Sequence, residues 1–187
     1  NMTVHYVMDD GSKAPSDSTQ TVSFTENGIK DNVTGNITWT PATSQTLKDV
    51  DSPVLTGYTA DIKTANGKVV NFGDPDINVT VHYSANAQTA TITYIDDTEK
   101  KTLGSDKQNG KFNQVITFEH DPAEVIKGLE EKGYKLVSND FNDNKYQADN
   151  SNNVFYVHLT HDTKKVSQEH SASFTVHYIY KDGRQAK

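Results

Sequence analysis

The sequence predicts a mainly β, α+β protein made of two small, related modules in series, with an elongated shape. Its 187 residues are only 33% hydrophobic, a supply that suits two small cores better than one large core. Thr, Val, Tyr, Phe and Ile recur in short runs between Asn, Asp, Gly and Ser, which is the composition of strands and turns. Several segments also occur more than once, which indicates repeated modules.

The internal repeats define the module boundaries. TVHYVMDDG at residues 3–11 returns as TVHYIYKDG at residues 175–183, the pattern of a tandem array that extends slightly past one period. Within that period, TGYTADI at residues 56–62 resembles KGYKLVS at residues 132–138. We therefore predict a first module, a second module, and then a linker with the first strand of a further repeat. Their ranges are residues 1–84, 85–162 and 163–187.

The opening and closing segments of each module have the alternation of β-strands. Val4, Tyr6 and Met8 share one face of an extended segment, whereas His5 lies on the other face. The same alternation recurs later in the chain, so Tyr is predicted to point inward in most of these strands and His outward. The later segments are residues 79–83, 90–94 and 155–159.

One segment has the start and stop signals of a helix. Asp121 suits an N-cap, Pro122 suits the first helical position, and Gly133 is a terminator. We predict a helix over residues 121–132, and four strands that carry one such helix would resemble a ubiquitin-like β-grasp. The equivalent part of the first module, residues 41–50, is shorter and is a weaker helix candidate.

Charge and composition exclude several functions. A net charge of -7 repels phosphate backbones and anionic lipids, so neither nucleic-acid binding nor membrane contact is expected. The absence of cysteine excludes disulfides and thiol chemistry. No apolar stretch is long enough to span a bilayer. No secretion or anchoring signal is recognised, so we expect the targeting information to lie outside this sequence.

Together these segments resemble the repeats of mucus-binding adhesins on Gram-positive bacteria. The similar segments follow one another in the order VTGNITWTPAT (33–43), SPVLTGYTAD (52–61), DINVTVHYS (76–84), QTATITYIDD (88–97) and EKGYKLVSNDF (131–141). The resemblance implies two β-grasp modules in a secreted protein that is anchored to the cell wall through regions outside this sequence. It also implies a non-enzymatic repeat that binds mucin glycoproteins weakly per copy and more strongly through many copies.

Two other functions stay open beside mucin binding. The family's fold is similar to that of bacterial immunoglobulin-binding domains, so an exposed sheet edge or the helix face is a candidate surface for immunoglobulins. The repeat is alternatively a spacer that holds a distal binding domain away from the cell. Neighbouring repeats of the same chain are expected partners in each case.

Trp39 is the candidate ligand-binding residue. It follows an alternating segment and precedes Pro41, so its ring is placed to stack on a sugar at a strand end. Partial core burial is the favoured alternative, because large aromatic side chains chiefly supply buried area. Tyr58 and Tyr134 occupy matched places in the two modules and are predicted to stabilise the fold.

No catalytic residue, cofactor or metal site is predicted. The acidic clusters at residues 9–10, 96–97 and 139–144 are explained as turns with solvated carboxylates, although a calcium site assembled from remote loops stays an open alternative. The histidines lie mainly on the outer faces of strands, and no third ligand has suitable spacing to His158 and His161. The seven are His5, His82, His120, His158, His161, His170 and His177.

Overall fold

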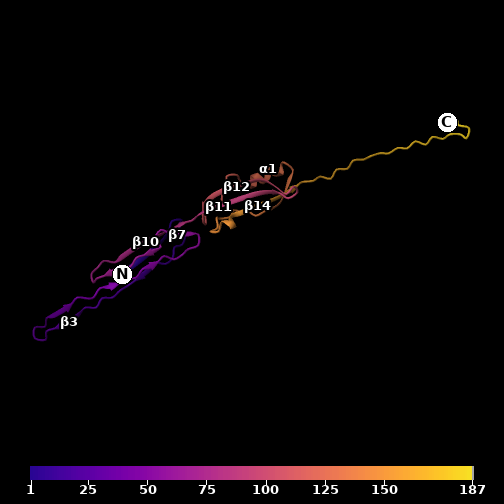
Figure 1. Ribbon diagram of the computed structural model, residues 1–187. Coiled ribbons are helices and arrows are strands. Elements are labelled where there is room, and N and C mark those ends of the chain that lie inside the picture. Colours follow the sequence, from indigo (N-terminus) through magenta and orange to yellow (C-terminus); the bar gives the residue numbers. More distant parts are fainter. Residues whose placement is uncertain (187) are drawn as a thin grey trace.

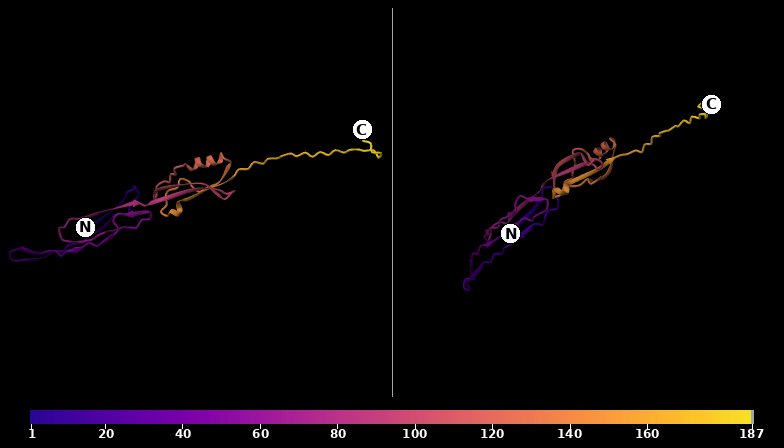
Figure 2. Two further views of the ribbon diagram at one scale, coloured as in Figure 1. Left: turned by 45° about the horizontal axis from the view of Figure 1, so that its top comes forward. Right: turned by 45° about the vertical axis from the view of Figure 1, so that its right-hand side comes forward.

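The computed structural model describes residues 1–186, which form an elongated molecule (Figure 1). Two four-stranded sheets follow one another along its length, as the turned views in Figure 2 also show. The described part of the chain contains a single α-helix, α1 (Pro122–Glu130). The prediction of a mainly β fold is therefore confirmed.

The first sheet has two parallel strands at its centre. β1 and β10 pair in parallel, from Met2 opposite Ile77 to Met8 opposite Tyr83. The two edge strands each pair antiparallel with their central neighbour. In spatial order the strands are β2 (Ser18–Gln20), β1 (Met2–Met8), β10 (Ile77–Ala85) and β7 (Tyr58–Ala60).

Between β2 and β10 the chain forms narrow two-stranded ribbons in place of a helix. The helix considered for residues 41–50 is wrong: this segment contains β5 and β6, and Leu47 is its only buried residue. A segment with one buried residue has no apolar stripe to hold a helix on a sheet. The pairs are β3 (Asn27–Lys30) with β4 (Ile37–Thr40), β5 (Gln45–Thr46) with β9 (Val69–Val70), and β6 (Val50–Asp51) with β8 (Thr64–Ala65).

The second sheet repeats the strand order of the first. β11 and β14 form the parallel central pair, and two antiparallel strands form the edges. A short 3-10 helix, η1 (Asn150–Asn153), leads into β14. The spatial order is β12 (Lys101–Lys111), β11 (Ala87–Asp96), β14 (Val154–His161) and β13 (Tyr134–Asn139).

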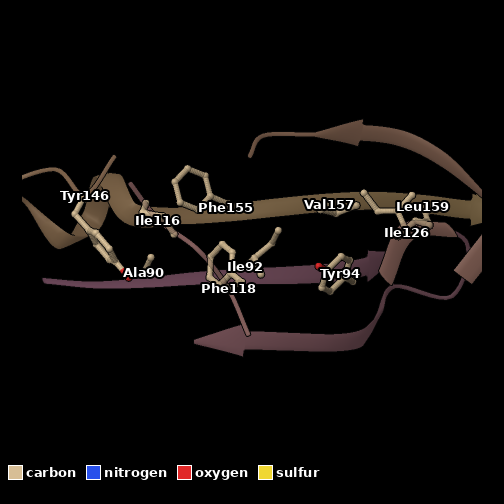
Figure 3. Packing of buried hydrophobic residues seen from close by; sticks show 10 residues of the cluster. All are labelled: Ala90, Ile92, Tyr94, Ile116, Phe118, Ile126, Tyr146, Phe155, Val157 and Leu159. Atoms are coloured by element: carbon tan, nitrogen blue, oxygen red, sulfur yellow. The ribbon is translucent and has the colours of Figure 1, made fainter. Parts of the chain in front are cut away.

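Helix α1 lies between β12 and β13 in the chain and packs against the second core. The predicted N-cap is confirmed, because the Asp121 carboxylate accepts a hydrogen bond from the backbone N–H of Ala123. Pro122 occupies the first turn, and the helix ends with Glu131 as its C-cap. Ile126 is the helix residue that belongs to the buried apolar cluster drawn in Figure 3.

Each sheet has its own hydrophobic core, and the predicted alternation places the side chains correctly. Tyr6, Tyr83 and Tyr94 are buried, as predicted for the inner positions. Full burial of a Val, Leu, Ile, Phe or Met side chain contributes roughly 1.5–3 kcal/mol. The first core contains Met2, Val4, Tyr6, Met8, Leu47, Ala65, Val70, Val81 and Tyr83. The second contains Ala90, Ile92, Tyr94, Ile116, Phe118, Ile126, Tyr146, Phe155, Val157 and Leu159 (Figure 3).

The C-terminal residues extend away from both sheets, as the yellow segment in Figures 1 and 2 shows. The strand predicted within residues 163–187 is not paired with either sheet in the described residues, which exclude Lys187, and only a bridge between Ile179 and Gln185 is formed there. An apolar strand with no neighbouring strand has no ladder to stabilise it. Within residues 1–186, no helix is long and apolar enough to cross a bilayer.

Candidate functional site

The two sheets meet at a joint centred on Asn86. This residue separates β10 from β11, its N–H donates to the Gly57 carbonyl at 2.9 Å, and its carbonyl accepts from the Phe112 N–H at 2.9 Å. The Asn86 side chain also accepts a hydrogen bond from Thr59 at 2.6 Å. The backbone of the joint is therefore tied to a loop of the first sheet and to the end of β12.

An aromatic contact completes the joint and explains a glycine. The rings of Tyr58 and Phe112 meet edge to face, with 5.3 Å between their centroids. Gly57 has φ +82, and a Cβ built on it would lie 2.4 Å from the Phe112 ring. Only glycine combines this backbone conformation with so close an aromatic neighbour. The prediction that Tyr58 has a structural role agrees with this contact.

A groove of about 760 Å³ lies beside the joint. One wall comes from the turn after β1 and the end of β10, and the other comes from the end of β12 and the loop that follows it. Most of the lining side chains are polar, and Phe112 supplies an aromatic surface. The lining residues are Asp10, Ser12, Ala85, Asn109, Gly110, Lys111, Phe112, Asn113 and Gln114.

Hydrogen bonds fix the Asp10 wall of this groove. The Asp10 carboxylate accepts from the Ser12 N–H at 2.9 Å and from the Tyr58 hydroxyl at 2.8 Å. The Ser12 N–H and then the Tyr58 hydroxyl lower the pKa of Asp10 below its ordinary value. Asp10 is therefore a positioned, ionised acceptor at neutral pH.

The histidines predicted to lie on outer strand faces are not merely solvated, because five of them contact aspartates. His82 Nδ1 lies 3.1 Å from Asp9, and His158 Nδ1 lies 2.9 Å from Asp97. These two pairs occupy equivalent places in the two sheets. The other three pairs are His5 with Asp17, His120 with Asp106 and His161 with Asp96.

The prediction that the acidic clusters hold only solvated carboxylates is wrong for Asp96. Its side chain is fully buried, and one oxygen accepts from the backbone N–H groups of Thr98 and Glu99. Burial raises the pKa of Asp96, but the two N–H groups and His161 outweigh that effect and hold it below its ordinary value. Asp96 therefore organises the turn between β11 and β12.

Asp96, Glu99 and His161 form the one group of three potential metal ligands in residues 1–186, with ligand atoms within 4.8 Å of one another. Sequence spacing did not show this group, because Asp96 ends β11, Glu99 lies in the turn that follows, and His161 ends β14. A mixed imidazole and carboxylate set suits transition metals better than calcium, which prefers more oxygen ligands. Lys101 also forms an ion pair with Glu99, so its ammonium group already neutralises part of the negative charge of the two carboxylates.

Trp39 lies outside both hydrophobic cores, so the favoured prediction of partial core burial is wrong. Its side chain is 58% exposed, because the ribbon of β3 and β4 extends beyond the first sheet (Figure 1). The indole lies across Gly28, where a Cβ would be 2.8 Å from the Trp39 Cε3 atom. Ile37 packs against the same glycine. The ribbon thus presents an open aromatic and aliphatic surface.

Two consecutive four-stranded sheets, with a groove beside the joint between them, place the described residues among the mainly β proteins. Residues 1–87 match the family model of the Muc B2-like domain, and residues 88–161 match that of the mucin binding domain. The chain therefore belongs to the mucin-binding domain family, and its resemblance to mucus-binding adhesin repeats is confirmed.

Solved structures with similarity to the chain carry related names. The mucin-binding domain of a Streptococcus pneumoniae protein is 25% identical, and the match covers 46% of this chain and 87% of that one, with a TM-score of 0.42. The MucBP domain of an adhesion protein from Pediococcus pentosaceus is 33% identical over 46% of this chain and 95% of that one, with a TM-score of 0.37.

A further similar structure is the type 2 repeat of the mucus binding protein MUB from Lactobacillus reuteri. It is 27% identical, and the match covers 54% of this chain and 60% of that one, with a TM-score of 0.39. A comparison with curated proteins found no match.

Proposed function

We propose that the chain is a non-enzymatic repeat of an extracellular bacterial adhesin and that it binds mucin glycoproteins. The observation that carries this proposal is the match of residues 88–161 to the mucin binding domain, directly after the match of residues 1–87 to the Muc B2-like domain. We infer that each domain is a module with its own core, and that the parent protein displays several such repeats from the cell wall.

The topology favours classing the modules as ubiquitin-like β-grasp folds. In the second sheet, the first and last strands form a parallel central pair, and α1 connects the two antiparallel edge strands. The first sheet has the same strand order with ribbons in place of the helix. This correspondence supports an origin of both modules from one ancestral unit.

Binding through many weak sites fits the surface of the chain better than one tight site. The groove at the joint is open, with polar side chains beside the Phe112 ring, and Trp39 is exposed on the ribbon of β3 and β4, far from this joint (Figure 1). Glycan chains on a mucin are themselves repeated. Linked weak contacts on both partners raise the overall affinity without any single strong contact.

A binding function also agrees with the state of the acidic side chains. The aspartates whose pKa is lowered accept hydrogen bonds from neighbouring backbone or side-chain groups, as Asp10 and Asp96 do. These partners hold turns and strand ends in place. A carboxylate stabilised in its ionised form is suited to accept hydrogen bonds, and it is a poor general acid at neutral pH.

Immunoglobulin binding is a second candidate because of one exposed edge. β13 is an outer strand of the second sheet, and its Leu136 and Val137 side chains are exposed. An apolar edge strand is a template for strand addition by a protein partner. The elongated shape is equally compatible with a spacer that makes no contact with the host.

Binding to two immobilised ligands, with competition by free glycans, distinguishes the three functions. The chain is passed over immobilised purified mucin and, in a parallel channel, over immobilised immunoglobulin. Binding to mucin that is blocked by released mucin glycans supports the proposal. Binding to immunoglobulin alone would favour an immunoglobulin-binding function, with the β13 edge as the candidate surface. Binding to neither surface would leave the spacer function as the remaining candidate.

A further inference from the structure

The groove at the joint has a shape that the fold sets in advance. Its walls belong to different sheets, yet Tyr58 connects them: its hydroxyl contacts Asp10 and Ser12, and its ring packs on Phe112. The backbone hydrogen bonds of Asn86 with Gly57 and Phe112 hold the same joint. A site whose walls are already fixed loses little conformational entropy when a ligand binds.

Several hydrogen-bonding groups of the groove are free to meet a ligand. The Asn109 carboxamide oxygen accepts from Thr89, and the Gln114 carboxamide oxygen accepts from the Lys111 N–H. The NH₂ groups of both side chains therefore remain as donors. The Lys111 ammonium group also lines the groove, and its charge helps to lower the pKa of the nearby Asp9. Donors thus line one wall, and the Asp10 acceptor lies on the other.

This arrangement matches a neutral, hydroxyl-rich ligand. A sugar hydroxyl both donates and accepts, so neighbouring hydroxyls can bridge an amide donor and a carboxylate acceptor. The ring of Phe112 offers an apolar surface for the C–H face of a sugar. A phosphorylated ligand is disfavoured by Asp10 and by the net charge of -7.

We propose that this groove is a subsite for a short, neutral oligosaccharide of the kind that decorates mucins. The assignment rests on the proposed function and adds the place where the glycan binds. Residues of both sheets contribute to the subsite, so neither domain alone contains it. The single-site affinity is weak, because the groove is open and its contacts are shared with water.

The test is a titration monitored by NMR. Neutral O-glycans released from purified gastric mucin are added to the ¹⁵N-labelled full chain. The variant Lys111→Ala/Gln114→Ala removes donors from one wall. Lys107→Ala, on the same strand but outside the groove, is the matched control. Trp39→Ala tests the alternative that the glycan binds the exposed aromatic surface of the β3 and β4 ribbon. Removal of two hydrogen bonds is expected to weaken binding about tenfold.

The expected result is that shifts concentrate on Asp10, Ser12 and residues 109–114, and that only the double variant weakens binding. Chemical-shift changes on β3 and β4, together with loss of binding in Trp39→Ala, would contradict the assignment of the subsite to the groove. The proposal that the chain binds mucin would still stand. Absence of any shift, together with binding to deglycosylated mucin, would overturn the groove and the glycan part of the proposed function together. Unchanged thermal stability of the variants separates a binding effect from a folding effect.

Discussion

His82 contacts Asp9 at 3.1 Å, and His158 contacts Asp97 at 2.9 Å in the equivalent place of the second sheet. In each case the aspartate follows the first strand and the histidine lies in the last strand. The aspartate N–H also donates to the last strand, to Tyr83 and to Leu159 respectively. The parallel central pair is thus closed at one end by the same side-chain and backbone contacts in both sheets.

We expect His158→Ala to lower the free energy of unfolding by about 1 kcal/mol, the typical contribution of one partly buried hydrogen bond. Urea denaturation measures this loss, and His170→Ala, in the exposed C-terminal segment, is the control. The contact with Asp97 contributes nothing to stability if the double variant Asp97→Ala/His158→Ala shows purely additive losses.

Gly57→Ala is expected to disturb the joint between the sheets. The added Cβ meets the Phe112 ring, and the backbone is strained at φ +82, so we expect a loss of roughly 1–3 kcal/mol. Gly35→Ala is the matched control, because Gly35 has φ +79 and open space around it. Thermal denaturation measures both losses, and Tm is expected to fall further in Gly57→Ala than in Gly35→Ala. Equal losses would mean that the Phe112 contact is unimportant for the joint.

Acid is expected to destabilise the fold through its aspartates. The pKa of Asp96 is held below its ordinary value of 3.8, so its contribution is fully present above that value and disappears as the pH falls through the lower, folded-state pKa. Thermal melts between about pH 2 and pH 7 should be flat above pH 4 and should fall below it.

Asp96→Asn should reduce stability at neutral pH and flatten the acid limb of this profile. Asp140→Asn is the control, since Asp140 is exposed and its side chain makes no hydrogen bond within residues 1–186. If Tm decreases equally with falling pH in the wild type and in Asp96→Asn, carboxylates other than Asp96 cause the loss of stability in acid.

Two buried tyrosines are expected to respond differently to loss of the hydroxyl. The Tyr94 hydroxyl has no partner among the described residues, and burial raises its pKa to about 12. The Tyr83 hydroxyl donates to the Pro53 carbonyl at 2.6 Å. Tyr83→Phe should therefore cost about 1 kcal/mol, whereas Tyr94→Phe should be neutral or stabilising. Denaturant unfolding of both variants checks this, and a comparable loss in Tyr94→Phe would indicate a bound water.

The long strands and the helix were predictable because their signals are local. Alternation over β1 and β11 identifies the inner tyrosines, and the sequence around Asp121 specifies the start of α1. The two-residue strands β5 and β6 show no periodicity, so their segment was open to a helical interpretation. Trp39 was misplaced because composition does not reveal that its ribbon extends beyond the core.

The sites between segments were not predictable, because they depend on register and on the joint. Asp10 and Gln114 line one groove because the two sheets meet at the joint, where Phe112 packs on Tyr58. The pair of His158 with Asp97 depends on the parallel alignment of β11 with β14. In both halves an aspartate follows the first strand and a histidine lies in the last strand. This repeated pattern was the one sequence signal that indicates the His–Asp contact, and it does so only if the two strands are known to pair in parallel.

The central claim is that this repeat binds mucin through its glycans. The most direct measurement compares binding of the full chain to immobilised purified mucin before and after enzymatic removal of the O-glycans. We predict weak, saturable binding that disappears with the glycans. Binding that survives complete deglycosylation would contradict the account and would identify the repeat as a protein-recognition module.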